Sequence, residues 1–380
     1  MKYLLIDGNN LAIRAAFAND YMTNEEGESS GAHYGFFNSL LNLKSRFPDS
    51  QILVAWDSSS QRRREESTVG VEVGMIPSIY KANRKEGETP AALQNWFDTG
   101  NHLKNALGAT GIPQIRVQGF EADDVIASYC ELLKHDNEVI VVTSDHDFYQ
   151  LLDDNAIVWD GMKEDYVTKD SFIEENGIEP RRHIDIGALM GDKGDNIFGI
   201  PGWGEKTALK EIIEHESWEN VIKNLEIKHK DIIDKYSPLT TEDSVLPNKL
   251  NPVFSGGPEA GDDPQGVFDG WNDLAKLKTD KDTLIYPEVY WGMPHSGLLM
   301  PFHEKKIKIP KKELMALMFK DRVKLAYSLK RMDTDIEGLP VIEREEQNKV
   351  RLLEYFQYYD IVSLIDRIDV LFNEVEHEYC

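Results

Sequence analysis

The sequence predicts an α/β protein with a doubly wound, mainly parallel sheet, followed by a helical module and an irregular insertion. Short apolar runs typical of buried strands alternate with stretches of helical period, as in parallel sheets with crossover helices. Three of these runs end at an aspartate, and beyond residue 180 helical patterning dominates. With 380 residues, 41% of them hydrophobic, the chain is long enough for about two domains.

The first half of the chain carries the predicted strands, which are bounded by turn residues or polar loops. They cover residues 2–6, 51–56, 114–117, 138–143 and 156–159. Helices are predicted between them at 11–18, 32–47, 90–109 and 121–135. Ligands of such sheets bind outside the carboxyl ends of the strands. The aspartates that end strands are therefore expected to converge on one rim.

Two stretches break this alternation. Residues 58–89 are polar and basic and have no core pattern, which predicts a mobile loop or arch. Residues 237–310 are rich in Pro, Gly, Asp and Trp with little periodicity, which indicates long loops. The domains expected are an α/β domain at 1–179 that includes the arch, a helical module at 180–227, an insertion at 228–312 and a C-terminal helical segment at 313–380.

Composition narrows the classes of function. A net charge of −25 argues against a general nucleic-acid coat protein, although a local basic track can still steer DNA. Only Cys130 and Cys380 are present, so neither a disulfide framework nor a Cys-rich zinc site is expected. No signal peptide or membrane span is predicted. These features together predict a cytoplasmic protein without a membrane partner.

A dense group of acids opens the predicted helix at 121–135. Glu121, Asp123 and Asp124 lie within four residues, and Glu121 and Asp124 share a helix face. Acids also favour a helix N-terminus, so capping explains one or two of them as well as a metal does. Further acids tip the balance, because Asp7, Asp57 and Asp145 end predicted strands.

The full set of acids predicts a site for a hard divalent cation. It adds Asp147 and, in the Gly-rich turn, Asp192 and Asp195. Oxygen ligands with few His or Cys nearby favour Mg²⁺ or Mn²⁺, which act on phosphates. Two such ions about 4 Å apart can activate a water and stabilise a leaving oxygen. Asp145 and Asp147 are expected on one side of an extended segment, with His146 pointing away.

Two basic features complete the pattern. Lys81 and Arg84, three residues apart, can clamp a phosphate, although charge runs such as theirs and Arg62-Arg63-Arg64 are usually only solvated. Residues 202–208 open a helix after a Gly-rich turn, where free N–H groups bind phosphate. An ordinary helix–helix turn is the alternative for that stretch.

Six segments carry a resemblance to a known family, in the family's order over roughly residues 1–225. They are Leu5–Asn9, Tyr34–Asn38, Tyr80–Arg84, Gly119–Asp124, Ser144–Asp147 and Gly191–Ala208. The chain resembles the 5′-nuclease (flap endonuclease) superfamily, with its PIN-like fold. It is most similar to the 5′–3′ exonuclease domain of bacterial DNA polymerase I and to stand-alone phage 5′–3′ exonucleases. Residues 320–335 resemble the segment that closes that domain, whereas 228–312 have no counterpart.

The resemblance implies roles for individual residues. The metal ligands would be Asp7, Asp57, Glu121, Asp123, Asp124, Asp145, Asp147, Asp192 and Asp195. Lys81 and Arg84 would be the catalytic cations. The residues that contact DNA would be Arg14, Tyr80, Gly202, Gly204, Lys206 and Thr207. The stretch 191–208 would be a helix–three-turn–helix, an element that often binds K⁺, and two Mg²⁺ or Mn²⁺ ions would be the cofactors.

The predicted function is a metal-dependent 5′–3′ exonuclease or flap endonuclease, free-standing and monomeric, in a bacterial cell or phage-infected host. Its partner would be DNA with a 5′ end or flap, or an RNA–DNA hybrid, during primer removal or DNA degradation. A replication protein could bind through 228–312 or the C-terminus. The alternatives are a non-catalytic DNA-binding relative and a PIN-type ribonuclease. An aspartyl-phosphate phosphatase would need an acid two residues after Asp7, where Asn9 stands.

Overall fold

The computed structural model describes residues 1–85, 88–161, 163–232, 309–344 and 346–372. Most of the predicted insertion at 228–312 therefore lies outside the described residues. The chain forms two compact units. Unit 1 comprises Met1–Gln61, Gly87–Glu175 and Met332–Cys380, and unit 2 comprises Arg62–Glu86 and Asn176–Arg331. Among the described residues, no helix is long and apolar enough to cross a membrane.

Unit 1 is built on a six-stranded sheet of order β3-β2-β1-β4-β5-β6. Its strands are β1 (Lys2–Asp7), β2 (Ser50–Ala55), β3 (Gln114–Ile115), β4 (Glu138–Val142), β5 (Ala156–Asp160) and β6 (Asp165–Val167). The first five are parallel and only β6 is antiparallel. The doubly wound, mainly parallel sheet is thus confirmed, with β6 as an unpredicted edge strand.

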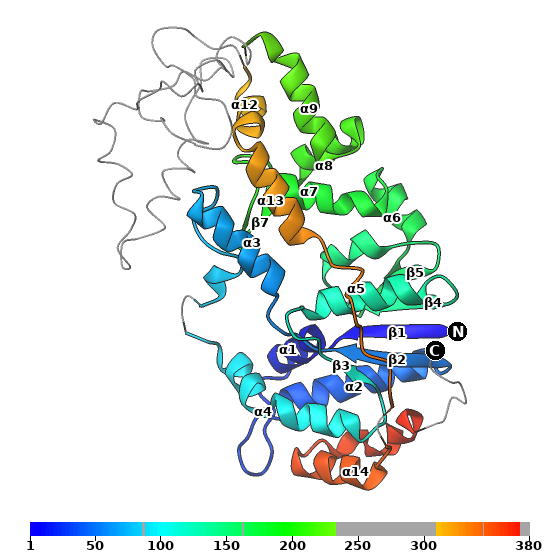
Figure 1. Ribbon diagram of the computed structural model, residues 1–380. Coiled ribbons are helices and arrows are strands. Elements are labelled where there is room, and N and C mark those ends of the chain that lie inside the picture. Colours follow the sequence, from blue (N-terminus) through cyan, green and yellow to red (C-terminus); the bar gives the residue numbers. More distant parts are fainter. Residues whose placement is uncertain (86–87, 162, 233–308, 345, 373–380) are drawn as a thin grey trace. The chain divides into compact units, whose positions relative to one another are not determined.

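Helices cover both faces of this sheet, as the alternation of strand and helix requires (Figure 1). Helices α1 (Gly8–Ala18), α2 (Gly31–Arg46) and α4 (Ala91–Gly108) share one apolar core with alternate strand residues such as Leu4, Ile6 and Val54. Helix α5 (Ala122–Leu133) packs on β1, β2 and β4. The central strands β1, β2 and β4 are consequently buried on both faces, which explains their apolar sequences.

The C-terminal segment completes the core of unit 1. Helix α14 (Lys349–Tyr358) and the 3₁₀ helix η5 (Val362–Leu371) place Leu352, Phe356 and Tyr359 in the same apolar cluster as α1, α2 and α4. Buried His33 stacks on Tyr359 with ring centroids 3.7 Å apart. Burial lowers the pKa of His33 to about 3, so this ring is neutral at physiological pH.

Unit 2 is mainly helical. It contains η3 (Pro180–Arg182), α7 (His183–Met190), α8 (Glu205–His215), α9 (Trp218–Lys228), α12 (Lys311–Met318) and α13 (Lys320–Lys330). Helix α13 packs on α7, and α12 packs on α9. Between α7 and α8 the chain makes a short hairpin of β7 (Gly191–Asp192) and β8 (Ile197–Phe198), which we call the acidic hairpin, residues 191–198. A Cβ on Gly191 would lie 2.5 Å from the Gly199 nitrogen, so glycine is required there.

Residues 58–89, expected to form a mobile loop or arch, contain helical structure that was not predicted. Residues 61–72 form helix α3 (Gln61–Glu72), and η1 (Ala82–Lys85) follows. Arg62 Nη1 donates to Ser328 O at 2.6 Å, and Arg63 Nε donates to Leu329 O at 2.9 Å. These arginines satisfy carbonyls at the end of α13, a role that composition alone does not reveal because the partners lie far along the chain. Arg63 is accordingly buried.

Candidate active site

The carboxyl edge of the parallel sheet in unit 1 carries four aspartates, which we call the acid rim: Asp7, Asp57, Asp145 and Asp160. Asp7 and Asp160 are the last residues of β1 and β5, Asp57 follows β2 and Asp145 follows β4. The strand order reverses between β1 and β4, which is where doubly wound sheets bind ligands. The predicted convergence of strand-end aspartates on one edge therefore follows from the topology observed.

Asp7 is one of the two buried members of the rim, only 7% exposed. Its carboxylate caps α1 by accepting the Asn10 N–H at 2.9 Å. The pKa of Asp7 is raised to about 7, chiefly by burial and also by the negative charges of Asp57 and Asp145, while backbone hydrogen bonds lower it. A divalent cation would reduce the repulsion between these neighbouring carboxylates. The oxygen donors therefore fit a hard metal ion.

The two exposed aspartates of the rim are held by backbone N–H groups. Asp57 accepts the Ala122 N–H at 2.9 Å, at the first residue of α5. Asp145 accepts the Asp147 N–H at 2.8 Å and so caps the 3₁₀ helix η2 (His146–Leu151). The expectation that 145–147 is extended, with Asp145 and Asp147 on one side, is thus wrong, because this side-chain hydrogen bond turns the backbone. His146 is exposed and stacks on Tyr149.

Asp160 is a rim acid that the sequence analysis did not single out. It follows the predicted strand at 156–159, so the rule that identified the other three strand ends would have found it. Asp160 is buried and lies 3.7 Å from the Lys163 ammonium. Its charge also acts on half-buried Arg14 of α1: burial lowers the pKa of Arg14, and Asp160 opposes that shift.

The acids at the start of α5 have partly structural roles. Glu121 is the N-cap and forms a capping box with Asp124. The group therefore caps the helix, as one of the two interpretations of its sequence expected, and its carboxylate oxygens are also of the type that binds metal. Asp124 is fully buried: one oxygen accepts the Glu121 N–H at 3.3 Å and the other accepts the Asp333 N–H at 2.9 Å. Asp123 is half-buried.

Unit 2 has its own group of acids, Asp192 and Asp195 of the acidic hairpin. Asp192 accepts the Gly194 N–H at 2.8 Å through Oδ1 and the Lys330 ammonium at 2.9 Å through Oδ2. Burial alone would raise the pKa of Asp192, but Lys330 and the turn N–H groups hold it below its ordinary value. Lys330 is buried on α13 and was not singled out, because 138 residues separate it from Asp192.

The predicted cations of the arch lie on the acidic hairpin. Arg84 pairs with Asp195 at 2.5 Å, and the Lys81 ammonium lies 3.8 Å from the same carboxylate. Tyr80, predicted to contact DNA, is 8% exposed, and its hydroxyl donates to Asp195 at 3.2 Å. The structure thus brings together three of the predicted site residues with a predicted metal ligand inside unit 2.

The start of α8 is open, as the phosphate-binding prediction requires. Gly204 is the N-cap, and a Cβ on Gly202 or Gly204 would meet nothing within 4 Å. Gly202 has φ +79°, a conformation that favours glycine. Lys206 is exposed, whereas the hydroxyl of Thr207 accepts the Lys312 ammonium at 3.0 Å. The free N–H groups at this helix end can meet a phosphate.

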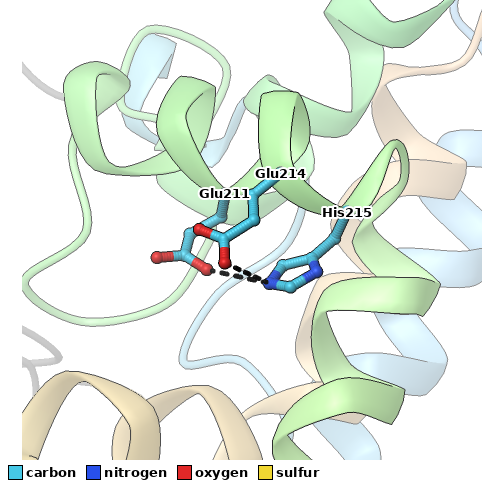
Figure 2. A group of neighbouring side chains, drawn as sticks. All are labelled: Glu211, Glu214 and His215. Carbon is cyan, nitrogen blue, oxygen red and sulfur yellow. Dashed lines mark ion pairs between the residues drawn. The ribbon is translucent and has the colours of Figure 1, made fainter.

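One further cluster lies at the other end of α8. Figure 2 shows Glu211 and Glu214 pointing toward the imidazole of His215, whose Nε2 lies 3.6 and 4.0 Å from their oxygens. Among the described residues, this is the only group whose ligand atoms all lie within 4.8 Å of one another. The positions of the three residues on one helix, with Glu211 four residues before His215, account for it.

Comparison with known families agrees with this architecture. Residues 2–177 match the family model of the 5′–3′ exonuclease N-terminal, resolvase-like domain. Residues 178–244 match that of the 5′–3′ exonuclease C-terminal SAM fold. The two models together span the acid rim, the acidic hairpin and the open start of α8.

Individual relatives point the same way. The chain is 36% identical over 237 residues to a 5′–3′ exonuclease of Bacillus subtilis, covering 60% of this chain and 75% of that protein. It is 36% identical over 230 residues to DNA polymerase I of Mycobacterium leprae, covering 59% of this chain but only 24% of the polymerase. Among solved structures, the catalytic core of Rad2 in complex with DNA substrate shares the fold. That match has a TM-score of 0.50 and 14% identity, and it covers 97% of this chain and 92% of that one. The chain therefore belongs to the 5′–3′ exonuclease family and is a nuclease.

Proposed function

We propose that this nuclease uses two Mg²⁺ or Mn²⁺ ions to hydrolyse phosphodiesters near the 5′ ends of DNA. The observation that carries the metal requirement is the acid rim: buried Asp7 has a pKa raised by its own burial and by the charges of Asp57 and Asp145. Such a site is electrostatically unfavourable unless a cation is bound there. Oxygen donors without nearby thiolates favour hard ions.

The protein's own groups have distinct tasks in this proposal. When bound, such ions make a water more acidic and neutralise charge on the phosphate. The ligands would be drawn from Asp7, Asp57, Glu121, Asp123, Asp124, Asp145, Asp147, Asp192 and Asp195. Lys81 and Arg84 would stabilise negative charge that develops on the phosphate oxygens. Asp57 and Asp145, whose carboxylates are fixed by backbone N–H groups, would lose little freedom on binding a cation.

The substrate proposal is DNA with a 5′ end or flap. The open N-terminus of α8, with Gly202, Gly204, Lys206 and Thr207, would contact the duplex backbone, and K⁺ could join it there. Arg14 and Tyr80 would lie nearer the reacting strand. RNA–DNA hybrids and a replication role extend the proposal, because relatives include DNA polymerase I. A replication partner at 228–312 or the C-terminus, a monomeric state and a cytoplasmic location belong to it as well.

The first experiment compares a 5′-flap duplex with a blunt duplex, each with Mg²⁺ and with EDTA. We expect products with 5′-phosphates, formed near the flap junction and abolished by EDTA. Cleavage that persists in EDTA would refute the metal requirement. An RNA-containing flap and a single-stranded RNA in the same assay separate the DNA nuclease from a PIN-type ribonuclease.

The second experiment replaces Asp145 with Asn, which keeps the size of the side chain and removes its charge. We expect cleavage to fall by at least about 100-fold while DNA binding in EDTA is largely retained, because a metal ligand contributes to the transition state. The matched control is Asp154→Asn, since Asp154 is highly exposed and pairs with Lys169. Undiminished turnover of the Asp145 variant would contradict the proposal, and a wild-type chain that binds DNA without cutting it would favour the non-catalytic alternative.

A further inference from the structure

Residues 78–84, which run into η1, are docked on the acidic hairpin by backbone and side-chain hydrogen bonds. Lys81 N donates to Asp195 O at 2.9 Å, and Asn83 Nδ2 donates to Lys193 O at 2.7 Å. In the opposite direction, Asn196 Nδ2 donates to Ile79 O at 2.6 Å and to Ser78 Oγ at 2.8 Å. Each of the two segments donates hydrogen bonds to the other, so the position of the first segment on the hairpin is well defined within unit 2.

The backbone geometry supports a specific docked state. Lys81 has φ +55° and Asn196 has φ +58°, in the left-handed region that non-glycine residues adopt rarely. A lysine in that region costs about 1 kcal/mol or more unless its surroundings fix it. Both residues make hydrogen bonds between the segment and the hairpin, and the Asn196 N–H also donates to Lys193 O at 3.4 Å within the hairpin.

This docking gives the Asp195 carboxylate three partners. Arg84 Nη2 lies 2.5 Å from Oδ1, the Tyr80 hydroxyl lies 3.2 Å from Oδ2 and Lys81 Nζ lies 3.8 Å from Oδ2. Asp195 is about four-fifths buried by these contacts, with its side chain 20% exposed, whereas Arg84 is 59% exposed. The two cations proposed to act on phosphate are thus held by an acid proposed to bind metal.

We propose that Asp195 exchanges partners, so that DNA and the divalent cation bind this site cooperatively. The inference rests on the proposed function and names how the same site is regulated. In the free chain, Arg84 and Lys81 occupy the carboxylate. A DNA phosphate attracts Arg84 and Lys81, which leaves Asp195 available for a divalent cation. A cation at Asp195 in turn repels Arg84 and Lys81 toward the phosphate, so each ligand strengthens the binding of the other.

The sign of the effect follows from competition. A divalent cation that binds Asp195 in the absence of DNA must displace or tolerate Arg84, and both cost free energy. Removing the positive charge of Arg84 should therefore tighten metal binding to the free chain. Because Arg84 is more than half exposed, the effect should be small, about two- to fivefold.

The test measures Mn²⁺ binding to the full chain by calorimetry, with and without a 5′-phosphorylated oligonucleotide whose linkages are phosphorothioates. The variants are Arg84→Gln, Arg84→Lys and Arg64→Gln. Arg64 lies exposed on α3 in the same unit, so its variant makes the same change in net charge away from Asp195. We expect about two- to fivefold tighter Mn²⁺ binding for Arg84→Gln without the oligonucleotide, and wild-type affinity for Arg64→Gln and Arg84→Lys.

The second part of the test measures Mn²⁺ binding in the presence of the oligonucleotide. The oligonucleotide should tighten Mn²⁺ binding to the wild-type chain by a larger factor than to Arg84→Gln, because that variant has lost part of the exchange. Equal or weaker Mn²⁺ binding by Arg84→Gln, or equal factors for both proteins, would overturn the exchange while leaving the proposed function intact. A wild-type chain that binds no Mn²⁺ and cuts no flap would instead overturn the proposed function.

Discussion

Asp7 has both a structural role, as the cap of a helix, and a chemical role, as a candidate metal ligand. Its carboxylate caps α1, and it is buried beside the charges of Asp57 and Asp145. A pKa raised to about 7, against 3.8 for the ordinary side chain, means that the folded protein binds this proton more tightly than the unfolded chain does. In the absence of metal, this contribution to stability is therefore fully present below pH 4 and is lost as the pH rises through 7.

Replacing Asp7 with Asn should remove that pH dependence. In EDTA at pH 8, we expect the free energy of unfolding to rise by about 2–4 kcal/mol, because a pKa unit corresponds to about 1.4 kcal/mol and the amide still caps α1. Thermal unfolding from pH 4 to pH 8 measures it, and flap cleavage should be lost. Asp154→Asn is the control for a change in net charge. An Asp7 variant that is less stable than the wild type at pH 8 in EDTA would contradict the account.

Some residues of the candidate site can be predicted from sequence and others cannot. Asp7, Asp57 and Asp145 could be placed on one edge because a parallel sheet brings the ends of its strands together, and Asp160 obeys the same rule. The Asx turn at Asp145 was missed because a single hydrogen bond decides it. Lys330 could not be found, since nothing local marks a partner 138 residues away.

At the scale of elements, helix α13 links distant parts of unit 2. Its carbonyls accept hydrogen bonds from Arg62 and Arg63 of α3, and its last residue, Lys330, pairs with Asp192. Helix α3 itself was not predicted within the expected loop or arch, because its buried face is made by Arg63, Ser67 and Gly70. A helix whose contacts are polar gives no apolar periodicity, which is the signal that sequence analysis depends on.

Replacing Lys330 with Met tests the link between α13 and the acidic hairpin. Met keeps the packing against Gly187, where the lysine stem passes, but leaves the Asp192 charge without its counterion. Because Asp192 is about one-third exposed, we expect a loss of about 1–3 kcal/mol in EDTA, less than for a fully buried pair. Mn²⁺ should then raise the melting temperature more in the variant than in the wild type.

The control for this prediction is Lys324→Met, an exposed position on the same helix. It should leave both the melting temperature in EDTA and its rise with Mn²⁺ unchanged. A Lys330 variant as stable as the wild type in EDTA would show that the pair with Asp192 contributes nothing to the fold.

At the scale of the whole molecule, a strongly acidic composition must be reconciled with the activity of a nuclease. The net charge of −25 opposes DNA, so binding must depend on local cations. Many of the cations in the described residues are already paired, as Lys330 and Lys228 are, with Asp192 and Glu313. The exposed Lys206 at the open end of α8 is the kind of group that can supply such a local field.

The elements on either side of residues 233–308 contact each other directly. At the end of α9, Lys228 and the C-cap residue His229 bind Glu313 of α12 at 2.9 and 2.6 Å, and buried Trp203 donates to Lys312 O at 3.2 Å. A Gly/Ser linker of about 12 residues, with a root-mean-square span of about 20 Å, should therefore replace 233–308 without unfolding unit 2. We expect a melting temperature within about 3 °C of the wild type and retained metal-dependent flap cleavage. As a control, Glu313→Gln in the shortened chain should lower the melting temperature, because the flanking helices lose their ion pairs. A folded, shortened chain that no longer cuts would instead assign part of the nuclease activity to 233–308.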